Sequence, residues 1–398
     1  MSENRKRQFA IYFMIIAVSA ISLGLSNGVM SNFFKDAYNV SAYQRGLIEF
    51  PRELPGLLAV LLIGSLSFLN DIRIAMLAQV CSVIGIGVLG LITPTFNVML
   101  IFVFINSMGM HIFKPMNDAI GISLAEEGNI GRRMGQFKGL DTGFRMLAGI
   151  LVFIGFRMGF FSFESDFRGP FIISALMSVL VIGLLVFLEK THSIDGLKPK
   201  KTKFVYRKEY KFYYILVILY GVQKQIMIVY GPWVLIDLLG KKADTLAMLS
   251  IIGAGIGIFF IPALGRWLDK FGIKKLMYVD AISFIVVYVL YGILTASFVG
   301  GALQSMTLAV GLAYGIFIID KMSTQMSMIR TVYLKSILVK PEDLTPSLSL
   351  GMSMDHFVSI TCAYLGGIVW MQFGPQYIFF FVAFLSLGNL YVATQLKE

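Results

Sequence analysis

Long apolar stretches recur along the whole chain and restrict its possible folds more than any other feature of the sequence. About a dozen of them, each roughly 20 residues long, are separated by short polar breaks. Because a bilayer core needs about 20 apolar residues per helix, each stretch is long enough to cross a membrane. The sequence therefore predicts an all-α membrane protein with twelve transmembrane helices, near residues 8–32, 42–68, 73–93, 97–124, 136–160, 169–188, 210–236, 245–266, 273–296, 301–327, 346–371 and 376–394.

The composition and the distribution of charge agree with a membrane location. The chain has 57% hydrophobic and 14% charged residues and a mean hydropathy of +0.77, which leaves too little polar surface for a soluble globule. Its net charge of +11 does not indicate a nucleic-acid partner, because Lys and Arg fall mainly in short loops on alternate sides of the spans. By the positive-inside rule we expect both termini in the cytoplasm and the protein in the cell (plasma, or inner) membrane. The basic residues of the opposite loops are Lys35, Arg45, Arg157, Arg168, Lys241 and Lys242.

The sequence contains no motif of an enzyme. Its two cysteines, Cys81 and Cys362, both lie in apolar runs, so they support neither a disulfide framework nor a cysteine metal site. Metal-ligand clusters, nucleotide loops and nucleophile elbows are also missing from the sequence. We expect no enzymatic activity, no cofactor and no bound metal.

One loop carries a specific motif. Residues 265–275 read Gly-Arg-Trp-Leu-Asp-Lys-Phe-Gly-Ile-Lys-Lys, with two glycines, an acid and several bases between two apolar spans. This pattern resembles the signature loop of the major facilitator superfamily, a class of membrane transporters with two six-helix halves. A degenerate copy at 67–73 keeps the acid but lacks both glycines. The candidate gating residues of the two copies are Asp71, Arg73, Gly265, Asp269, Gly272 and Lys274.

The resemblance implies a domain organisation and a mechanism. It implies two pseudo-symmetric six-helix bundles, at 1–188 and 210–398, joined by a basic cytoplasmic linker at 189–209, and alternating access by rocking of the two halves. It implies that Asp269 pairs with or caps neighbouring helix ends and that Gly265 permits close packing. Spans 3, 6, 9 and 12 are expected outside, and the other spans are expected to line a central path. The Gly-Pro element typical of antiporters is missing from span 5, which argues against an exporter.

Ionisable residues inside the spans supply the candidate site. Such side chains cost several kcal/mol in hydrocarbon unless they are paired or face water, so each is a candidate for function. Among the four outer spans, only span 9 carries such a charge, Asp280. The proton-coupling candidates are Glu49, Glu53, Asp118, Asp141, Asp320, Asp355 and His356. The substrate-binding candidates are Arg52, Lys114, Arg145, Tyr220, Gln223, Lys224 and Lys321.

Two groups of charges allow both a functional and a structural interpretation. Glu49 and Glu53 share a helix face in a segment with two prolines, where we expect a kink, and Arg52 is a possible cation between them. They are either protonatable groups or an ion pair that fixes span 2 to a neighbour. The couples Lys114/Asp118 and Asp141/Arg145 have the spacing of intrahelical ion pairs, and they form either a cytoplasmic gate or substrate site, or static contacts between helices.

The predicted function is secondary active transport of a small polar, anionic, zwitterionic or amphipathic solute, with coupling to protons. The intramembrane cations favour a solute with an anionic group. One alternative is a proton-driven exporter of drugs or lipid-like compounds. Another is a non-transporting membrane sensor on a transporter fold. The expected partners are the solute, protons and membrane lipids, and the expected state is a monomer.

Overall fold

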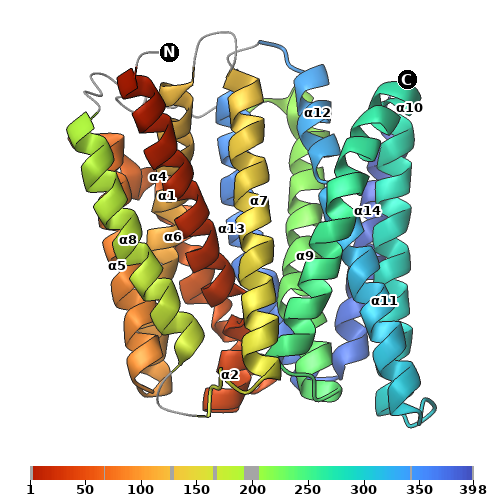
Figure 1. Cartoon of the computed structure of the whole chain (residues 1–398). Helices are drawn as coiled ribbons and strands as arrows, with labels where there is room; N and C mark the ends of the chain where they lie inside the picture. Colours follow the sequence, from red (N-terminus) through yellow and green to blue (C-terminus); the bar gives the residue numbers. More distant parts are fainter. Residues whose placement is uncertain are drawn as a thin grey trace. The chain divides into compact units, whose positions relative to one another are not determined.

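A computed structural model describes residues 3–66, 68–125, 130–164, 168–191, 206–340 and 343–396. Every regular element in these ranges is helical (Figure 1). The middle of the expected linker, residues 192–205, lies outside the described residues. The helices are α1 (Glu3–Asn27), α2 (Met30–Tyr38), α3 (Ala42–Leu47), α4 (Glu49–Ser65), α5 (Asp71–Leu91), α6 (Phe96–Leu124), α7 (Ile130–Arg157), α8 (Gly169–Thr191), a 3-10 turn (Lys208–Tyr210), α9 (Lys211–Trp233), a π-helical turn (Val234–Leu238), α10 (Ala243–Val299), α11 (Met306–Gln325), α12 (Met328–Ser336), α13 (Leu344–Gln372) and α14 (Pro375–Gln395).

These helices account for the predicted spans. Nine segments of the described chain are long and apolar enough to cross a membrane. One of them, the 57-residue α10, contains two expected spans, which are separated at Gly272, where φ is 81° and the backbone is not helical. Helices α4 and α13 occupy the two expected spans that are not among the nine. The prediction of an all-α membrane protein with twelve transmembrane helices is confirmed.

The second expected span is interrupted, as its sequence predicts, but the interruption lies before the prolines. Helix α3 ends at Leu47 and α4 begins at Glu49, whereas Pro55 lies inside α4. Helix α3 starts with a capping box, in which the Ser41 side chain accepts a hydrogen bond from the Gln44 backbone and Gln44 bonds back to Ser41. This cap allows a short helix to begin independently of α4.

The chain forms two compact units. The first unit comprises residues 1–39, 51–200 and 243–251, and the second comprises 40–50, 201–242 and 252–398. A short stretch of the N-terminal part of the chain, with α3, thus belongs to the second unit. The first residues of α10 belong to the first unit.

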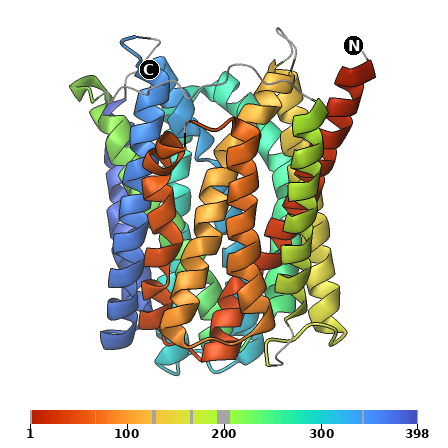
Figure 2. The same cartoon turned by 90° about the vertical axis from the view of Figure 1, so that its left-hand side faces the viewer.

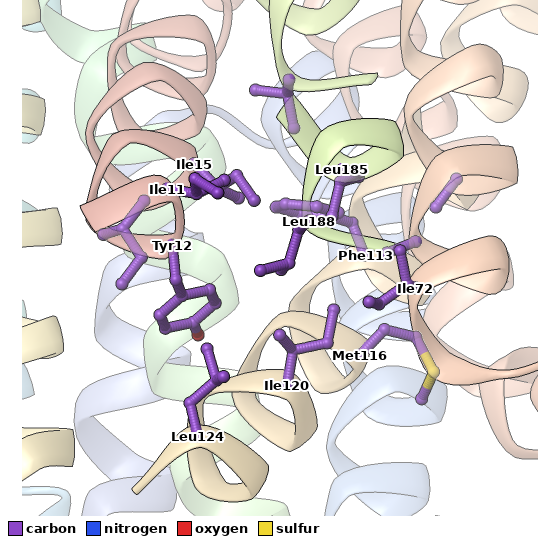
Figure 3. Packing of buried hydrophobic residues seen from close by; sticks show 14 of the residues in the cluster. Ile11, Tyr12, Ile15, Ile72, Phe113, Met116, Ile120, Leu124, Leu185 and Leu188 are labelled. Atoms are coloured by element: carbon purple, nitrogen blue, oxygen red, sulfur yellow. The ribbon is translucent and has the colours of Figure 1, made fainter. Parts of the chain in front are cut away.

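The first unit is held together by helix pairs with an apolar core. Helix α5 packs against α6 and α8, and α1 packs against α7 and α8 (Figure 2). Figure 3 shows the core, in which side chains of α1, α5, α6 and α8 gather in one cluster. The buried Tyr12 of α1 also donates a hydrogen bond to the Asn117 carbonyl oxygen of α6 at 2.6 Å. Arg168 fixes the end of α5, because its guanidinium donates to the Ile92 carbonyl oxygen at 3.1 Å.

In the second unit, α13 packs against α9, α3 and α14. Polar contacts fix the start of α9. Arg207 and Tyr210 both donate hydrogen bonds to the Asp343 carboxylate, at 2.5 and 2.9 Å, and the Tyr210 hydroxyl accepts one from the Val339 backbone. Burial raises the pKa of Asp343, but the bonds from Arg207 and Tyr210 and the Arg207 charge outweigh it and hold this pKa below its usual value.

Candidate functional site

Lys224 and Asp355 form an ion pair between α9 and α13 in the second unit. The Lys224 ammonium donates to Oδ2 of Asp355, and the two side chains keep 22% and 20% of their surface exposed. Gly221 lies one turn before Lys224, and a Cβ atom at this glycine would come 2.9 Å from Oδ1 of Asp355. That oxygen has no hydrogen-bond partner among the described residues. The pair is mostly buried but keeps about a fifth of each side chain exposed, and its acid has one oxygen without a hydrogen-bond partner among the described residues.

A second ion pair lies close by and is sealed. Arg330 of α12 donates to Oδ2 of Asp280 at 2.7 Å, and the side chains are only 4% and 0% exposed. The Arg330 guanidinium also lies 4.3 Å from the centre of the Tyr220 ring, a cation–π contact. Because Tyr220 is one turn from Lys224 on α9, it connects the sealed pair to the accessible one.

Arg330 was not among the candidates named from the sequence. Asp280 was the single charge of this kind in an outer span, and an acid in such a place needs a cation on a neighbouring helix. Asp280 alone therefore indicates that a cation lies nearby, although its partner Arg330 is 50 residues away in the sequence. The position of α12 decides which cation it is.

The third pair of the second unit joins Arg45 to Glu49. Nη1 of Arg45 donates to Oε1 of Glu49 at 2.5 Å, the amide of Gln225 donates to Oε2 at 2.8 Å, and the ion-paired side chains are 1% and 0% exposed. The close approach of α3 to α9 and α13 seals this pair. A Cβ atom at Gly46 would lie 2.3 Å from the Ala363 carbonyl oxygen.

Arg45 is a cation beside Glu49 that the sequence did not predict, since the sequence placed Arg45 in an outer loop and offered Arg52 as a possible cation for this acid. The spacing of Arg45 and Glu49, four residues apart, is the signal that could have identified this pair. Glu53, which shares a helix face with Glu49 in the sequence, lies in the part of α4 that belongs to the first unit.

Asp320 of α11 is a buried acid that forms no ion pair with the described residues. Its residue is 2% exposed, and no hydrogen bond or ion pair to its carboxyl group is found among the described residues. The adjacent Lys321 ammonium instead lies 4.9 Å from the centre of the Phe317 ring. The lysine named as a substrate-binding candidate therefore makes a cation–π contact on its own helix.

The first unit carries a more open group of charges on α6 and α7. Nε of Arg145 donates to both carboxylate oxygens of Asp141 at 3.0 Å, which realises the intrahelical pair expected from the sequence. Lys114 and Asp118, the other expected couple, are exposed and do not approach within the 4.0 Å of an ion pair. On the same face of α6 as these residues, His111 contacts the Ser107 carbonyl oxygen through Nδ1 at 2.9 Å.

A family model described as Major Facilitator Superfamily matches residues 12–336 of the chain. The chain belongs to the major facilitator superfamily. Its family and its fold are those of membrane transporters, and this confirms the resemblance seen in the signature loop. No curated protein matches the sequence.

Solved structures of transporters share the fold of this superfamily member along almost the whole chain. A variant of the nucleoside transporter NupG has a TM-score of 0.79 at 15% identity, covering 98% of this chain and 100% of that one. A POT family transporter in complex with a thioalcohol-conjugated peptide has a TM-score of 0.76 at 13% identity, covering 98% and 96%. A bacterial homologue of the iron transporter ferroportin has a TM-score of 0.73 at 13% identity, covering 99% of both chains. At these identities the similarity shows the fold alone.

The superfamily loop differs from its expected geometry in two respects. A Cβ atom at Gly265 would have no heavy atom within 4 Å, so this glycine does not serve close packing as the resemblance implied. Asp269 is exposed, and no hydrogen bond or ion pair to it is found in the described part of the chain. Gly272 alone has the backbone that requires a glycine, with φ at 81°. Lys274 lies just after that break.

The degenerate copy of the loop, at 67–73, makes more side-chain contacts than the 265–275 copy among the described residues of this superfamily member. Asn70 caps α5 by accepting the Arg73 backbone N–H at 2.9 Å, and the Arg73 side chain pairs with Glu189 of α8 at 2.6 Å. Asp71, the acid that the two copies share, is buried in the first turn of α5. The weaker sequence match thus makes the more specific contacts.

The remaining site candidates from the sequence lie in different surroundings. Gln223 faces α14, where its amide donates to Ser386 at 2.7 Å and accepts from Asn389 at 3.3 Å, so its bonding groups hold helices together. The Tyr220 hydroxyl donates to the Thr324 carbonyl oxygen at 3.3 Å. Arg52 offers its carbonyl oxygen to Ser107. His356 follows Asp355 on α13 and is half-buried.

Proposed function

We propose that this transporter couples the movement of a small solute with an anionic group to the movement of a proton, and that the Lys224–Asp355 pair is the exchangeable element. A carboxylate or phosphate group of the solute binds the Lys224 ammonium in place of Asp355. The released Asp355 then takes up a proton, because an unpaired carboxylate at this depth is costly. Zwitterionic solutes satisfy the same requirement through their acidic group.

The difference in exposure between the ion pairs of the second unit supports this proposal. Of the three intramembrane ion pairs described in the second unit, the Lys224–Asp355 pair keeps about a fifth of each side chain exposed, whereas the Arg330–Asp280 and Arg45–Glu49 pairs are almost fully buried. Only an accessible pair can exchange its acid for a ligand. The free oxygen of Asp355 adds a position for a proton without a change in backbone.

Asp320 is a second proton-binding candidate in the proposal. No ion pair to its carboxyl group is found among the described residues, and an unpaired charge is costly in the bundle interior. The relatives of known structure are named for nucleosides, a peptide and iron, so they do not specify the solute of this chain.

A binding experiment tests the solute class directly. Thermal unfolding of the purified protein is measured with panels of carboxylated, phosphorylated, zwitterionic and uncharged solutes, since a ligand that binds the folded state raises the melting temperature. The proposal predicts stabilisation by anionic or zwitterionic solutes and its loss in Lys224→Gln. Arg157→Gln, which removes a highly exposed cation beside Asp244, is the matched control and keeps the effect. Stabilisation that survives in Lys224→Gln contradicts the assignment.

The proposal also covers topology and assembly. The excess of Lys and Arg in the termini and alternate loops supports cytoplasmic termini and a location in the plasma membrane. A monomeric state is proposed as well. Accessibility of a single cysteine introduced at either terminus to a membrane-impermeant reagent in intact cells tests the orientation. Labelling of a terminus from the outside contradicts it.

A further inference from the structure

A polar cavity lies inside the first unit, away from the charged groups described above. It provides about 10 Å³ in which the centre of a water molecule can lie. Eleven residues line it, and none of them carries a charge. The polar ones are Ser19, Ser22 and Ser26 of α1, Gln79 and Ser82 of α5, Asn106 of α6, and Ser174 and Ser178 of α8.

Close contact between α5 and α6 brings the two amides to this cavity. A Cβ atom at Gly109 would lie 2.5 Å from the Ala78 carbonyl oxygen, and one at Gly85 would lie 2.5 Å from the Asn106 backbone nitrogen. Glycines at both positions let the helix backbones approach, as small residues do between membrane helices. Gln79 and Asn106 are therefore enclosed, with only 4% and 6% of their surface exposed.

These two amides have no hydrogen-bond partner within the described part of the protein, although both are more than nine-tenths buried. Leaving a buried amide without a partner costs about 1–3 kcal/mol on the scale of protein mutations. The surrounding serines do not donate to them. Ser19, Ser26 and Ser82 donate to carbonyl oxygens of their own helices, and Ser22 bonds to Ser174 and Ser178 of α8.

We infer that one water molecule binds in this cavity and joins Gln79 and Asn106 to the serine oxygens. A buried water needs about 10–15 Å³ of such volume and two to four polar partners, and the cavity meets both requirements. Water both donates and accepts, which suits two amides and a set of hydroxyl oxygens with free lone pairs. A desolvated monovalent cation fits less well, because no lining residue supplies a negative charge.

Radiolytic labelling by synchrotron X-rays, read by mass spectrometry, tests the inference, because hydroxyl radicals formed from a bound water oxidise the side chains next to it. Phe113 lines the cavity and Phe137 does not, and both are 4% exposed in the same unit. We predict oxidation of Phe113 several-fold faster than that of Phe137. Equal rates in the wild-type protein overturn the inference.

Two variants and a salt comparison complete the test. Asn106→Leu removes one water ligand and is expected to lower Phe113 labelling to the level of Phe137. Gln79→Met, whose unbranched side chain follows a similar path, is the second variant if the first does not fold. Labelling of Phe113 that is unchanged in a folded variant contradicts the site. A melting temperature that rises in sodium chloride but not in choline chloride at equal ionic strength shows a cation instead and also contradicts it.

Discussion

The Lys224 ammonium contacts one oxygen of the Asp355 carboxylate, while the other oxygen faces Gly221 without a hydrogen-bond partner from the described residues. The glycine thus sets the distance between α9 and α13 at the ion pair. Of the intramembrane pairs in the second unit, this one combines exposure with an unused acceptor. The proposed exchange of Asp355 for a solute group requires both the exposure of the pair and the unpaired oxygen.

Gly221→Ala is expected to disturb this pair. Its Cβ atom would come 2.9 Å from Oδ1 of Asp355, and added atoms in a packed interior cost about 1–3 kcal/mol. We predict a lower melting temperature and slower transport. Gly257→Ala in α10 is the matched control, because its Cβ atom meets no atom within 4 Å, and an added methyl in a helix is neutral or slightly stabilising. Equal behaviour of the two variants is inconsistent with close packing at Gly221.

Arg330→Met is predicted to destabilise the second unit strongly. Removing one partner of a buried pair leaves the Asp280 charge uncompensated, which costs about 3–5 kcal/mol. Arg330→Met with Asp280→Leu is expected to recover much of this loss, because both charges are then gone. For comparison, Arg73→Gln removes a half-exposed pair with Glu189 and should cost at most about 1 kcal/mol. Chemical denaturation measures all three, and a small effect of Arg330→Met alone refutes the prediction.

Gly46→Ala tests the packing of α3 within the second unit. The new methyl would meet the Ala363 carbonyl oxygen at 2.3 Å and the Tyr230 hydroxyl at 2.7 Å, so α3 must shift, and we expect this shift to disturb the Arg45–Glu49 pair. We expect a loss of stability at the upper end of the 1–3 kcal/mol typical of overpacking. Gly64→Ala in α4, which has open space around it, serves as the control. A Gly46→Ala protein that melts like Gly64→Ala rules out this arrangement.

The Arg207–Asp343 contact predicts a pH dependence of stability. The pKa of Asp343 is lower in the folded state than the ordinary value of about 3.9, so its contribution is fully present above that value and disappears as the pH falls through the folded pKa. Arg207→Gln is therefore expected to lower stability at neutral pH and to flatten the loss of stability below about pH 4. Thermal unfolding of both proteins from neutral to acidic pH measures this. Parallel pH profiles contradict the prediction.

The spans were predictable because the bilayer demands long apolar helices wherever the chain crosses it. Gly272 was predictable for a similar reason, since a sharp break between two spans needs a residue that accepts positive φ. The partner of Asp280 was not, because it depends on where α12 packs, whereas the four-residue spacing of Arg45 and Glu49 does indicate their pair. Gln79 and Asn106 could not be predicted from the pattern of charges, because both are neutral amides. The contacts implied for Gly265 and Asp269 came from the resemblance alone, and none is found among the residues that the structure describes.

The proton-coupling role of Asp355 is tested most directly in liposomes with the solute that stabilises the protein. Wild-type protein is predicted to accumulate this solute when a pH gradient is imposed and to exchange labelled for unlabelled solute without one. Asp355→Asn is predicted to keep the exchange and to lose accumulation, because the amide cannot take up the proton that the released carboxylate takes up. Accumulation by Asp355→Asn at the wild-type level contradicts the account.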